Sequence, residues 1–88
     1  MKARRFMIQG RVQGVGFRYF ALQRAHAAGV KGFARNNPDG TVEVWAEGLE
    51  KALAIFEADL RQGPAMSRVE NVWVDLVMPR GESAFEIR

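Results

Sequence analysis

The sequence predicts an α+β fold in which two helices cover one face of an antiparallel sheet. Segments that alternate between apolar and polar residues are separated by two segments in which apolar residues recur at helical spacing. Glycine or proline stands at most of the junctions between them. The resulting order, β-α-β-β-α-β, is that of the ferredoxin-like α/β sandwich. A further short strand at the C-terminus is expected to join an edge of the sheet.

The first half of the chain contains three of the expected strands and one helix. Residues 4–12 alternate between apolar and polar, which predicts a half-buried strand. Residues 17–28 contain no glycine or proline and repeat apolar residues at helical spacing, which predicts a helix. Residues 30–36 and 41–46 alternate again and flank an Asn-Pro-Asp-Gly turn, so we expect them to form a hairpin.

The second half contains one helix and two strands. A helix over residues 49–60, ended by Gly63-Pro64, is predicted by an apolar stripe at i, i+4, i+7 and i+11. The stripe consists of Leu49, Leu53, Phe56 and Leu60. Residues 69–77 predict a strand, with a β-bulge near Glu70-Asn71, where the alternation changes phase. Residues 85–87 are expected to form the short final strand.

Length and composition favour a small globular protein. We expect one domain over residues 1–88, because so short a chain has no room for a second core. The chain has no cysteine, which excludes disulfides and thiolate chemistry, and no apolar stretch of transmembrane length. A cytoplasmic monomer with neither membrane nor nucleic-acid partners is therefore expected.

Charge is unevenly distributed along the chain. Residues 1–38 contain eight basic residues and no acidic one, whereas residues 39–88 contain five basic and ten acidic residues, for a net charge of +3. A positive field of this kind concentrates anions. From charge alone, a solvated basic face without a ligand is favoured over a binding site.

A glycine-dense stretch lies between the first strand and the first helix. It reads Gly10-Arg11-Val12-Gln13-Gly14-Val15-Gly16-Phe17-Arg18. A turn of this kind leaves N–H groups unpaired at the helix start, where the helix dipole adds partial positive charge. Arg18, in the first helical turn, adds a planar fork of donors that suits phosphate or carboxylate oxygens. We therefore expect this loop to hold a phosphoryl group.

The sequence lacks other phosphate-binding motifs and the residue patterns of metal sites. Tyr19 occupies the third glycine position of a Gly-x-Gly-x-x-Gly pattern begun at Gly14, and no nucleotide P-loop is present. No cluster of residues has metal-ligand spacing, the single His26 is expected to be structural, and no cofactor is expected. Hydrolysis of a carboxylic–phosphoric anhydride fits such a site, because the carboxylate leaving group needs neither a proton nor a metal.

Asn36 is the best candidate for positioning the attacking water. It ends the strand that follows the first helix, and its amide can orient a water through donor and acceptor together. The alternative is that Asn36 only shapes the turn that follows it. From composition alone, the turn role is favoured.

Two stretches match a known family. The glycine-dense stretch resembles the signature of the acylphosphatases. Gly32-Phe33-Ala34-Arg35-Asn36, followed by Asp39-Gly40-Thr41-Val42 and Gly48, resembles their second signature. The separation of the motifs, the length of the chain and the order of its elements also match. Two departures are that Gly16 stands where some members carry Cys or a larger residue, and that Arg88 stands where an aromatic residue is frequent.

The resemblance implies a ferredoxin-like fold and the metal-independent hydrolysis of acyl phosphates to a carboxylate and inorganic phosphate. It assigns phosphate binding to the backbone N–H groups of Gln13, Gly14, Val15, Gly16 and Phe17. It implies that Arg18 clamps the phosphoryl oxygens and that Asn36 holds the nucleophilic water. No metal site and no cofactor are implied.

Three other functions are compatible with parts of the sequence. Ferredoxin-like sheets also bind single-stranded RNA through aromatic residues on their open face, and Trp45 and Trp73 are expected to lie off the helix-covered face. The aromatic-rich motif of such domains is missing, however. Similar domains also begin larger carbamoyl-transfer proteins, although a stand-alone enzyme is the simpler expectation. The third possibility is a small-anion binder without turnover.

Overall fold

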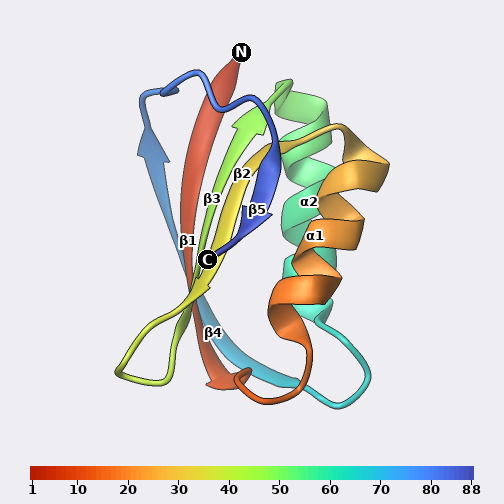
Figure 1. Ribbon diagram of the computed structural model, residues 1–88, viewed down its shortest axis with the longest axis vertical. Helices are drawn as coiled ribbons and strands as arrows, with labels where there is room; N and C mark the ends of the chain where they lie inside the picture. Colours follow the sequence, from red (N-terminus) through yellow and green to blue (C-terminus); the bar gives the residue numbers. More distant parts are fainter.

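A computed structural model describes all residues from 1 to 88 and contains five strands and two helices (Figure 1). In chain order the elements are β1 (Lys2–Arg11), α1 (Phe17–Ala28), β2 (Lys31–Asn36), β3 (Val42–Gly48), α2 (Glu50–Gln62), β4 (Arg68–Val77) and β5 (Phe85–Ile87). This is the predicted order, with the short C-terminal strand included.

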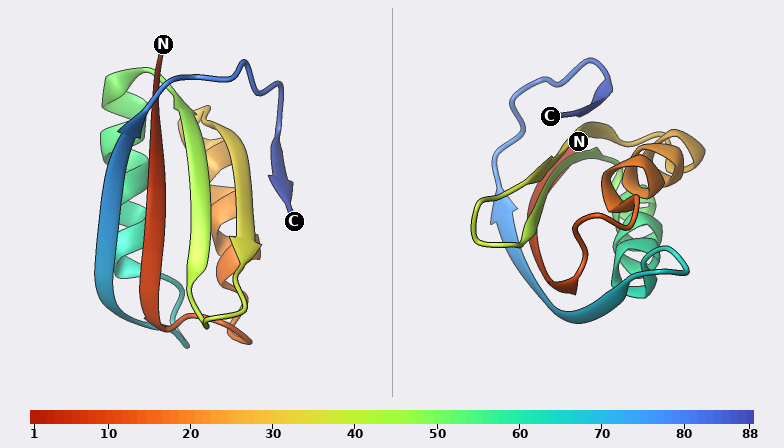
Figure 2. Two further views of the ribbon diagram at one scale, coloured as in Figure 1. Left: turned by 90° about the vertical axis from the view of Figure 1, so that its left-hand side faces the viewer. Right: turned by 60° about the horizontal axis from the view of Figure 1, so that its bottom comes forward.

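The five strands form one sheet in the order β4-β1-β3-β2-β5. The first four are antiparallel to their neighbours, as predicted, but β5 pairs with β2 in parallel. The expectation of a purely antiparallel sheet is therefore wrong. The reason is that β4 ends at the end of the sheet where β2 begins, and the connection over residues 78–84 crosses to the far edge there (Figure 2). The chain then has to run in the direction of β2.

Both helices cover the same face of the sheet (Figure 2), and the main core lies between the two layers. Leu53, Phe56 and Leu60 of α2 are fully buried, as their spacing predicts. Leu49 is an exception, because α2 begins at Glu50 and Leu49 is its N-cap residue, with 72% of its surface exposed. Neither helix has both the length and the apolar character needed to cross a bilayer.

The predicted bulge lies where β1 meets β4. Gln9 pairs with Asn71 and Gly10 with Val69, so Glu70 is the extra residue in β4. The strands approach so closely here that a β-carbon on Gly10 would lie 2.0 Å from the carbonyl oxygen of Arg68. A bulge bends the strand locally, and β1 leads directly into the glycine-dense loop.

A second, smaller apolar cluster lies on the open face of the sheet. It contains Phe33 and Trp45, whose rings are stacked with their centroids 6.5 Å apart. The guanidinium groups of Arg88 and Arg80 lie over these rings, so both rings are buried. Trp45 is off the helix-covered face, as predicted, but its ring is closed off from solvent by the 78–84 connection.

The carboxylate of Glu47 fastens this connection to the sheet. It is fully buried and accepts hydrogen bonds from the Trp45 indole (2.8 Å) and from the backbone N–H groups of Arg80, Gly81 and Glu82 (2.6, 3.1 and 3.0 Å). Burial raises the pKa of Glu47, but these four hydrogen bonds outweigh it, so its pKa lies below the usual value. The charged form is therefore the one that holds β5 at the sheet edge.

We expect Glu47→Gln to destabilise the fold by about 1.5–3 kcal/mol at pH 7, because an amide leaves a buried N–H donor facing other donors. A lowered pKa in the folded state stabilises the protein above pH ~4.3, the ordinary value for Glu, and this contribution is lost as the pH falls through the folded-state value. Urea unfolding between pH 3 and 7 should therefore show a weaker pH dependence for Glu47→Gln than for wild type. Glu70→Gln, at an exposed position, is the matched control. Equal stability of Glu47→Gln and wild type at pH 7 would contradict this role.

Candidate active site

The glycine-dense loop presents unpaired backbone donors. Gly14 and Gly16 have φ angles of 74° and 77°, a left-handed conformation that glycine adopts without steric cost. The loop therefore curls at the start of α1, and none of the N–H groups of residues 13–17 donates a hydrogen bond within the chain. A β-carbon on either glycine would meet no protein atom within 4 Å. The space beside the loop is thus open to a ligand.

The start of α1 adds to the positive potential at the loop. Its N-cap residue is Gly16, which offers no side chain to the unpaired N–H groups, and the first turn contains no acidic residue. The partial positive charge of the helix terminus is therefore not neutralised within the chain. The unpaired N–H groups at the start of α1 could therefore donate hydrogen bonds to a bound oxyanion, since no protein group accepts from them.

A pocket of about 180 Å³ brings five of the seven predicted site residues together, whereas Gln13 and Val15 do not line it. It is lined by Val12, Gly14, Gly16, Phe17, Arg18, Tyr19, Asn36 and Ile87. The loop and α1 form one wall, and the ends of β2 and β5 form the other. N–H groups, one guanidinium and one carboxamide thus face the same small space, and no carboxylate or imidazole lines it. His26 lies exposed on α1 and does not line the pocket.

A larger hollow of about 580 Å³ lies elsewhere, on the open face of the sheet. Its lining includes Asp39, Glu70 and Trp73 but none of the predicted site residues. The Thr41 side chain and backbone hydrogen-bond to Asp39 and lower its pKa, so this carboxylate is ionised at neutral pH. Carboxylates repel a phosphoryl dianion, which makes the smaller pocket the candidate for phosphate.

Arg18 is the one charged residue in the pocket lining, and no Asp or Glu side chain pairs with it. Its Nη1 donates a hydrogen bond to the main-chain oxygen of Arg88, the last residue of the sequence (3.0 Å), so the guanidinium reaches from α1 to the end of β5. Arg5 and Arg35, in contrast, both bind the buried carboxylate of Glu43 on the open face (2.7 and 2.5 Å). Of these three basic residues of the N-terminal half, Arg18 alone keeps its charge available to a ligand in the pocket.

Asn36 faces the pocket, and the neighbouring Asn37 shapes the turn. Ala34 and Asn36 lie on the helix-covered face of β2 by strand alternation, and Ala34 is part of the core. The Asn36 amide makes no hydrogen bond within the chain. Asn37 donates to the Thr41 hydroxyl (3.1 Å) and its N–H to the Thr41 carbonyl (2.9 Å). The turn role that composition favours for Asn36 therefore belongs to Asn37.

The side chain of Gln13 has a contact that the sequence did not indicate. Its Nε2 donates to the carbonyl oxygens of Asn37 (2.7 Å) and Thr41 (3.0 Å). This amide ties the loop to the turn that follows Asn36, which fixes the distance between the two parts of the site. The contact joins segments 24 and 28 residues apart, so nothing in the local sequence pattern could predict it.

Comparisons with known proteins show the family of the chain. The model of the acylphosphatase family matches residues 4–87. The acylphosphatase of Thermus thermophilus is 47% identical over 81 residues, which are 92% of each chain. The crystal structure of acylphosphatase from Bacillus subtilis superposes with a TM-score of 0.98 at 38% identity, over 100% of this chain and 99% of that one.

The chain also resembles one part of a much larger protein. The structure of full-length HypF in its phosphate- and nucleotide-bound form superposes with a TM-score of 0.86 at 34% identity, but the match covers only 12% of that chain. The match to the Thermus and Bacillus proteins, in contrast, spans nearly their whole length. The chain belongs to the acylphosphatase family, whose members hydrolyse the carboxyl–phosphate bond of acyl phosphates.

Proposed function

We propose that this protein hydrolyses acyl phosphates without a metal ion, by holding the phosphoryl group in the 13–18 loop and a water molecule at Asn36. One observation supports this most strongly. Three loop residues with unpaired N–H groups (Gly14, Gly16 and Phe17), an arginine that no Asp or Glu side chain binds and an amide without a hydrogen bond line one pocket. Such a set of donors complements a phosphoryl group and leaves one side of it open to water.

The chemistry follows from what these groups can stabilise. The N–H groups and Arg18 bind the phosphoryl oxygens and spread the charge that they carry in the transition state. Asn36 accepts a hydrogen bond from the water and orients its lone pair toward phosphorus, in line with the leaving group. The leaving group is a carboxylate, whose conjugate acid has a pKa of about 4, so it departs without protonation. Water thus attacks phosphorus, and the carboxyl–phosphate bond breaks at the P–O bond.

The implied partners are the acyl phosphate and the products of its hydrolysis. The open face is poorly suited to RNA, because Phe33 and Trp45 are buried beneath Arg88 and Arg80. Trp73 is exposed, but it lines a hollow together with Asp39 and Glu70, whose carboxylates repel phosphate groups. We also infer a cytoplasmic location from the cysteine-free sequence, and a single domain that acts as a monomer. Size-exclusion chromatography with light scattering tests the last point.

We predict that Gly14→Val abolishes phosphate binding. A valine would have to adopt the left-handed φ of 74°, which β-branched residues strongly disfavour, and its side chain would project into the pocket that Gly14 lines. Isothermal titration with inorganic phosphate measures the loss. Gly29→Val is the control, since Gly29 has a similar φ of 75° at the C-terminal end of α1 and does not line the pocket. Unchanged phosphate affinity in Gly14→Val would rule out the backbone cradle.

The function is tested by hydrolysis of benzoyl phosphate, followed by absorbance, with a chelator present throughout. Turnover that is insensitive to the chelator is expected. If folded protein shows no turnover while inorganic phosphate still raises its melting temperature, the loop binds anions without catalysis and the proposal fails. Turnover that disappears with the chelator would contradict metal independence.

A further inference from the structure

We infer that Tyr19 and Ile87 form a subsite for the acyl group at the mouth of the pocket, and that it favours uncharged aromatic acyl phosphates. The inference rests on the proposed function, since it concerns the part of the substrate that leaves. Within that function it adds a substrate class and two residues that determine it. Neither residue takes part in phosphate binding.

The pocket is too small to enclose a whole acyl phosphate of ordinary size. Its volume of about 180 Å³ is below the ~300–1,000 Å³ that is usual for small-molecule sites. The loop, Arg18 and Asn36 occupy the inner part with the phosphoryl group and water. The acyl group beyond its carboxyl carbon therefore has to lie at the mouth, where it meets the rim of the pocket.

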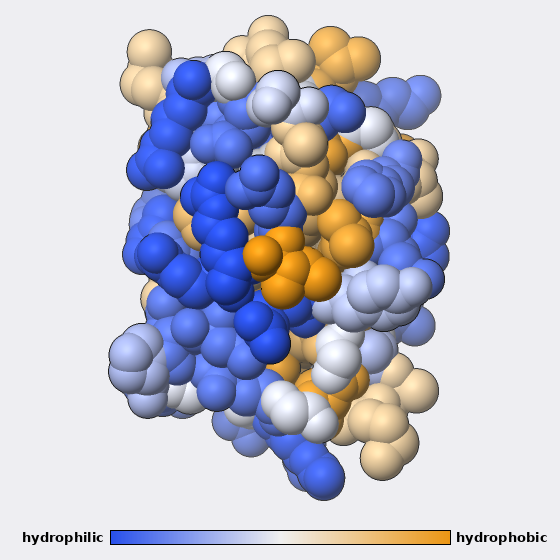
Figure 3. All heavy atoms as spheres, in the orientation of Figure 1, coloured by the Kyte–Doolittle hydropathy of each residue, from blue (hydrophilic) through white to orange (hydrophobic).

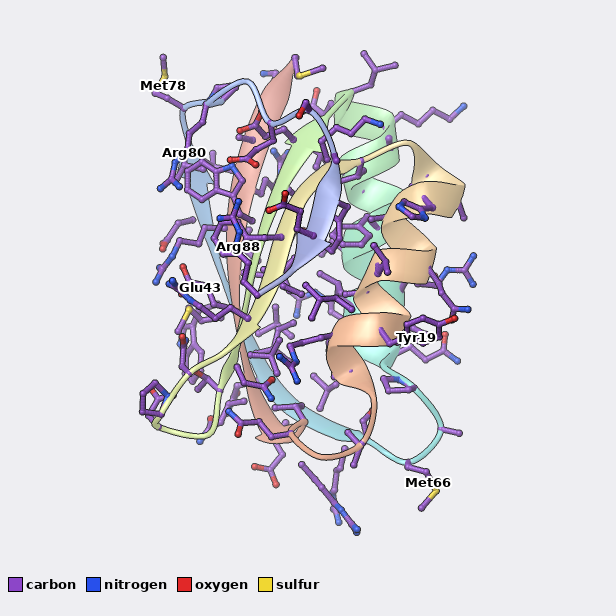
Figure 4. The ribbon with its side chains drawn as sticks, in the orientation of Figure 1. Tyr19, Glu43, Met66, Met78, Arg80 and Arg88 are labelled. Carbon is purple, nitrogen blue, oxygen red and sulfur yellow. The ribbon has the colours of Figure 1, made fainter.

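Two large side chains form that rim. Tyr19 is 59% exposed and Ile87 is 43% exposed, whereas Val12 and Phe17 in the same lining are buried in the core. Figure 4 shows Tyr19 on α1 and Arg88, which follows Ile87, at the end of β5, and Tyr19 and Ile87 both line the pocket. Apolar surface also lies near the centre of this face, beside strongly hydrophilic surface (Figure 3).

The hydrogen bond between Arg18 and Arg88 fixes both rim residues relative to the phosphate clamp. Tyr19 follows Arg18 directly and Ile87 precedes Arg88 directly, and the bond of 3.0 Å joins the two walls at this point. Ile87 is further held because it pairs with Ala34 of β2, two residues before Asn36. An acyl group that extends from the bound phosphoryl group toward the mouth of the pocket therefore lies between the ring of Tyr19 and the aliphatic side chain of Ile87.

The charges around the mouth narrow the class of acyl group. Arg18 is the single charged residue of the lining and is assigned to the phosphoryl group, and no Asp or Glu side chain lines the pocket. Arg88 nearby is already paired with Glu82 and Glu86. An acyl group with its own carboxylate or ammonium group therefore finds no free partner, whereas an aromatic ring can stack on Tyr19.

The test compares kcat/KM for benzoyl phosphate and acetyl phosphate in wild type and in Tyr19→Ala. We expect wild type to prefer benzoyl phosphate, and Tyr19→Ala to lower kcat/KM for benzoyl phosphate by about five- to tenfold, as the loss of one aromatic contact implies. The value for acetyl phosphate should change less than about twofold, because its methyl group barely reaches the rim. Ile87→Ala should act in the same direction, and Tyr19→Phe, which keeps the ring, should retain the preference.

The outcomes separate the subsite from the function itself. Gln23→Ala is the matched control, since Gln23 is exposed one turn further along α1 and does not line the pocket. Equal losses for both substrates in Tyr19→Ala, or an unchanged ratio of the two kcat/KM values, would overturn the subsite while leaving the hydrolase intact. Failure of the proposed function would instead appear as wild-type protein that hydrolyses neither substrate.

Discussion

Arg18→Ala is expected to raise KM for benzoyl phosphate and to lower kcat, so that kcat/KM falls by about 10³-fold or more. The guanidinium is the one charged side chain that lines the pocket, and no Asp or Glu side chain pairs with it. It therefore interacts with the phosphoryl oxygens both in the bound substrate and in the transition state, which is why both kinetic constants change. Steady-state hydrolysis of benzoyl phosphate measures the effect.

Two variants separate this role from a general effect of charge. Arg24→Ala removes an arginine from the same helix whose partner is Asp59, and it should leave kcat/KM nearly unchanged. Arg18→Lys keeps the charge but loses the planar fork that reaches both the ligand and the carbonyl of Arg88, so we expect it to recover only part of the activity. A loss in Arg24→Ala as large as that in Arg18→Ala would show that Arg18 acts only through the overall field.

Asn36→Ala is expected to lower kcat by about 10²–10³ with little change in KM, as the loss of one positioned polar group does in other enzymes. The amide has no structural partner in the chain, so its removal should not affect the turn, which Asn37 and Thr41 hold. Affinity for inorganic phosphate should be retained, because Asn36 is assigned to the water and not to the phosphoryl oxygens.

The control for this variant is Asn71→Ala, which removes an exposed asparagine that hydrogen-bonds Gln9 on the surface of the sheet. It should have wild-type kinetics. A kcat near the wild-type value in Asn36→Ala would remove this residue from the mechanism. A melting temperature lowered in Asn36→Ala but not in Asn71→Ala would instead favour the structural role that composition suggested for Asn36.

Local patterns in the sequence predicted most of the fold. The alternation in β1 and β3, the helical spacing in α2 and the phase change at Glu70 each depend on neighbouring residues, and the structure has all of them. The glycine-dense loop could also be recognised from the sequence, because its conformation depends on the residue type at individual positions. Gly14 and Gly16 stand where the backbone takes a positive φ, which the chain can adopt there at low cost only with glycine.

Features that depend on contacts between distant segments were not predictable in this way. The parallel pairing of β5 follows from the path of the 78–84 connection, which the buried carboxylate of Glu47 holds. Leu49 fits the apolar stripe of α2 but lies at its N-cap, where no core faces it. The roles of Asn36 and Asn37 also could not be separated from composition, since Asn36 is the last residue of β2 and Asn37 is the first residue after it.

The most direct test of the mechanism is hydrolysis of benzoyl phosphate in water enriched with oxygen-18, with the products analysed by mass spectrometry after a single turnover. In the proposed mechanism the loop and Arg18 hold the phosphoryl group while Asn36 directs water to phosphorus, so the label is predicted to enter inorganic phosphate and to be absent from benzoate. Label found in benzoate would mean that water attacks the carbonyl carbon instead. The phosphate cradle would then only bind the substrate, and the role assigned to Asn36 would be wrong.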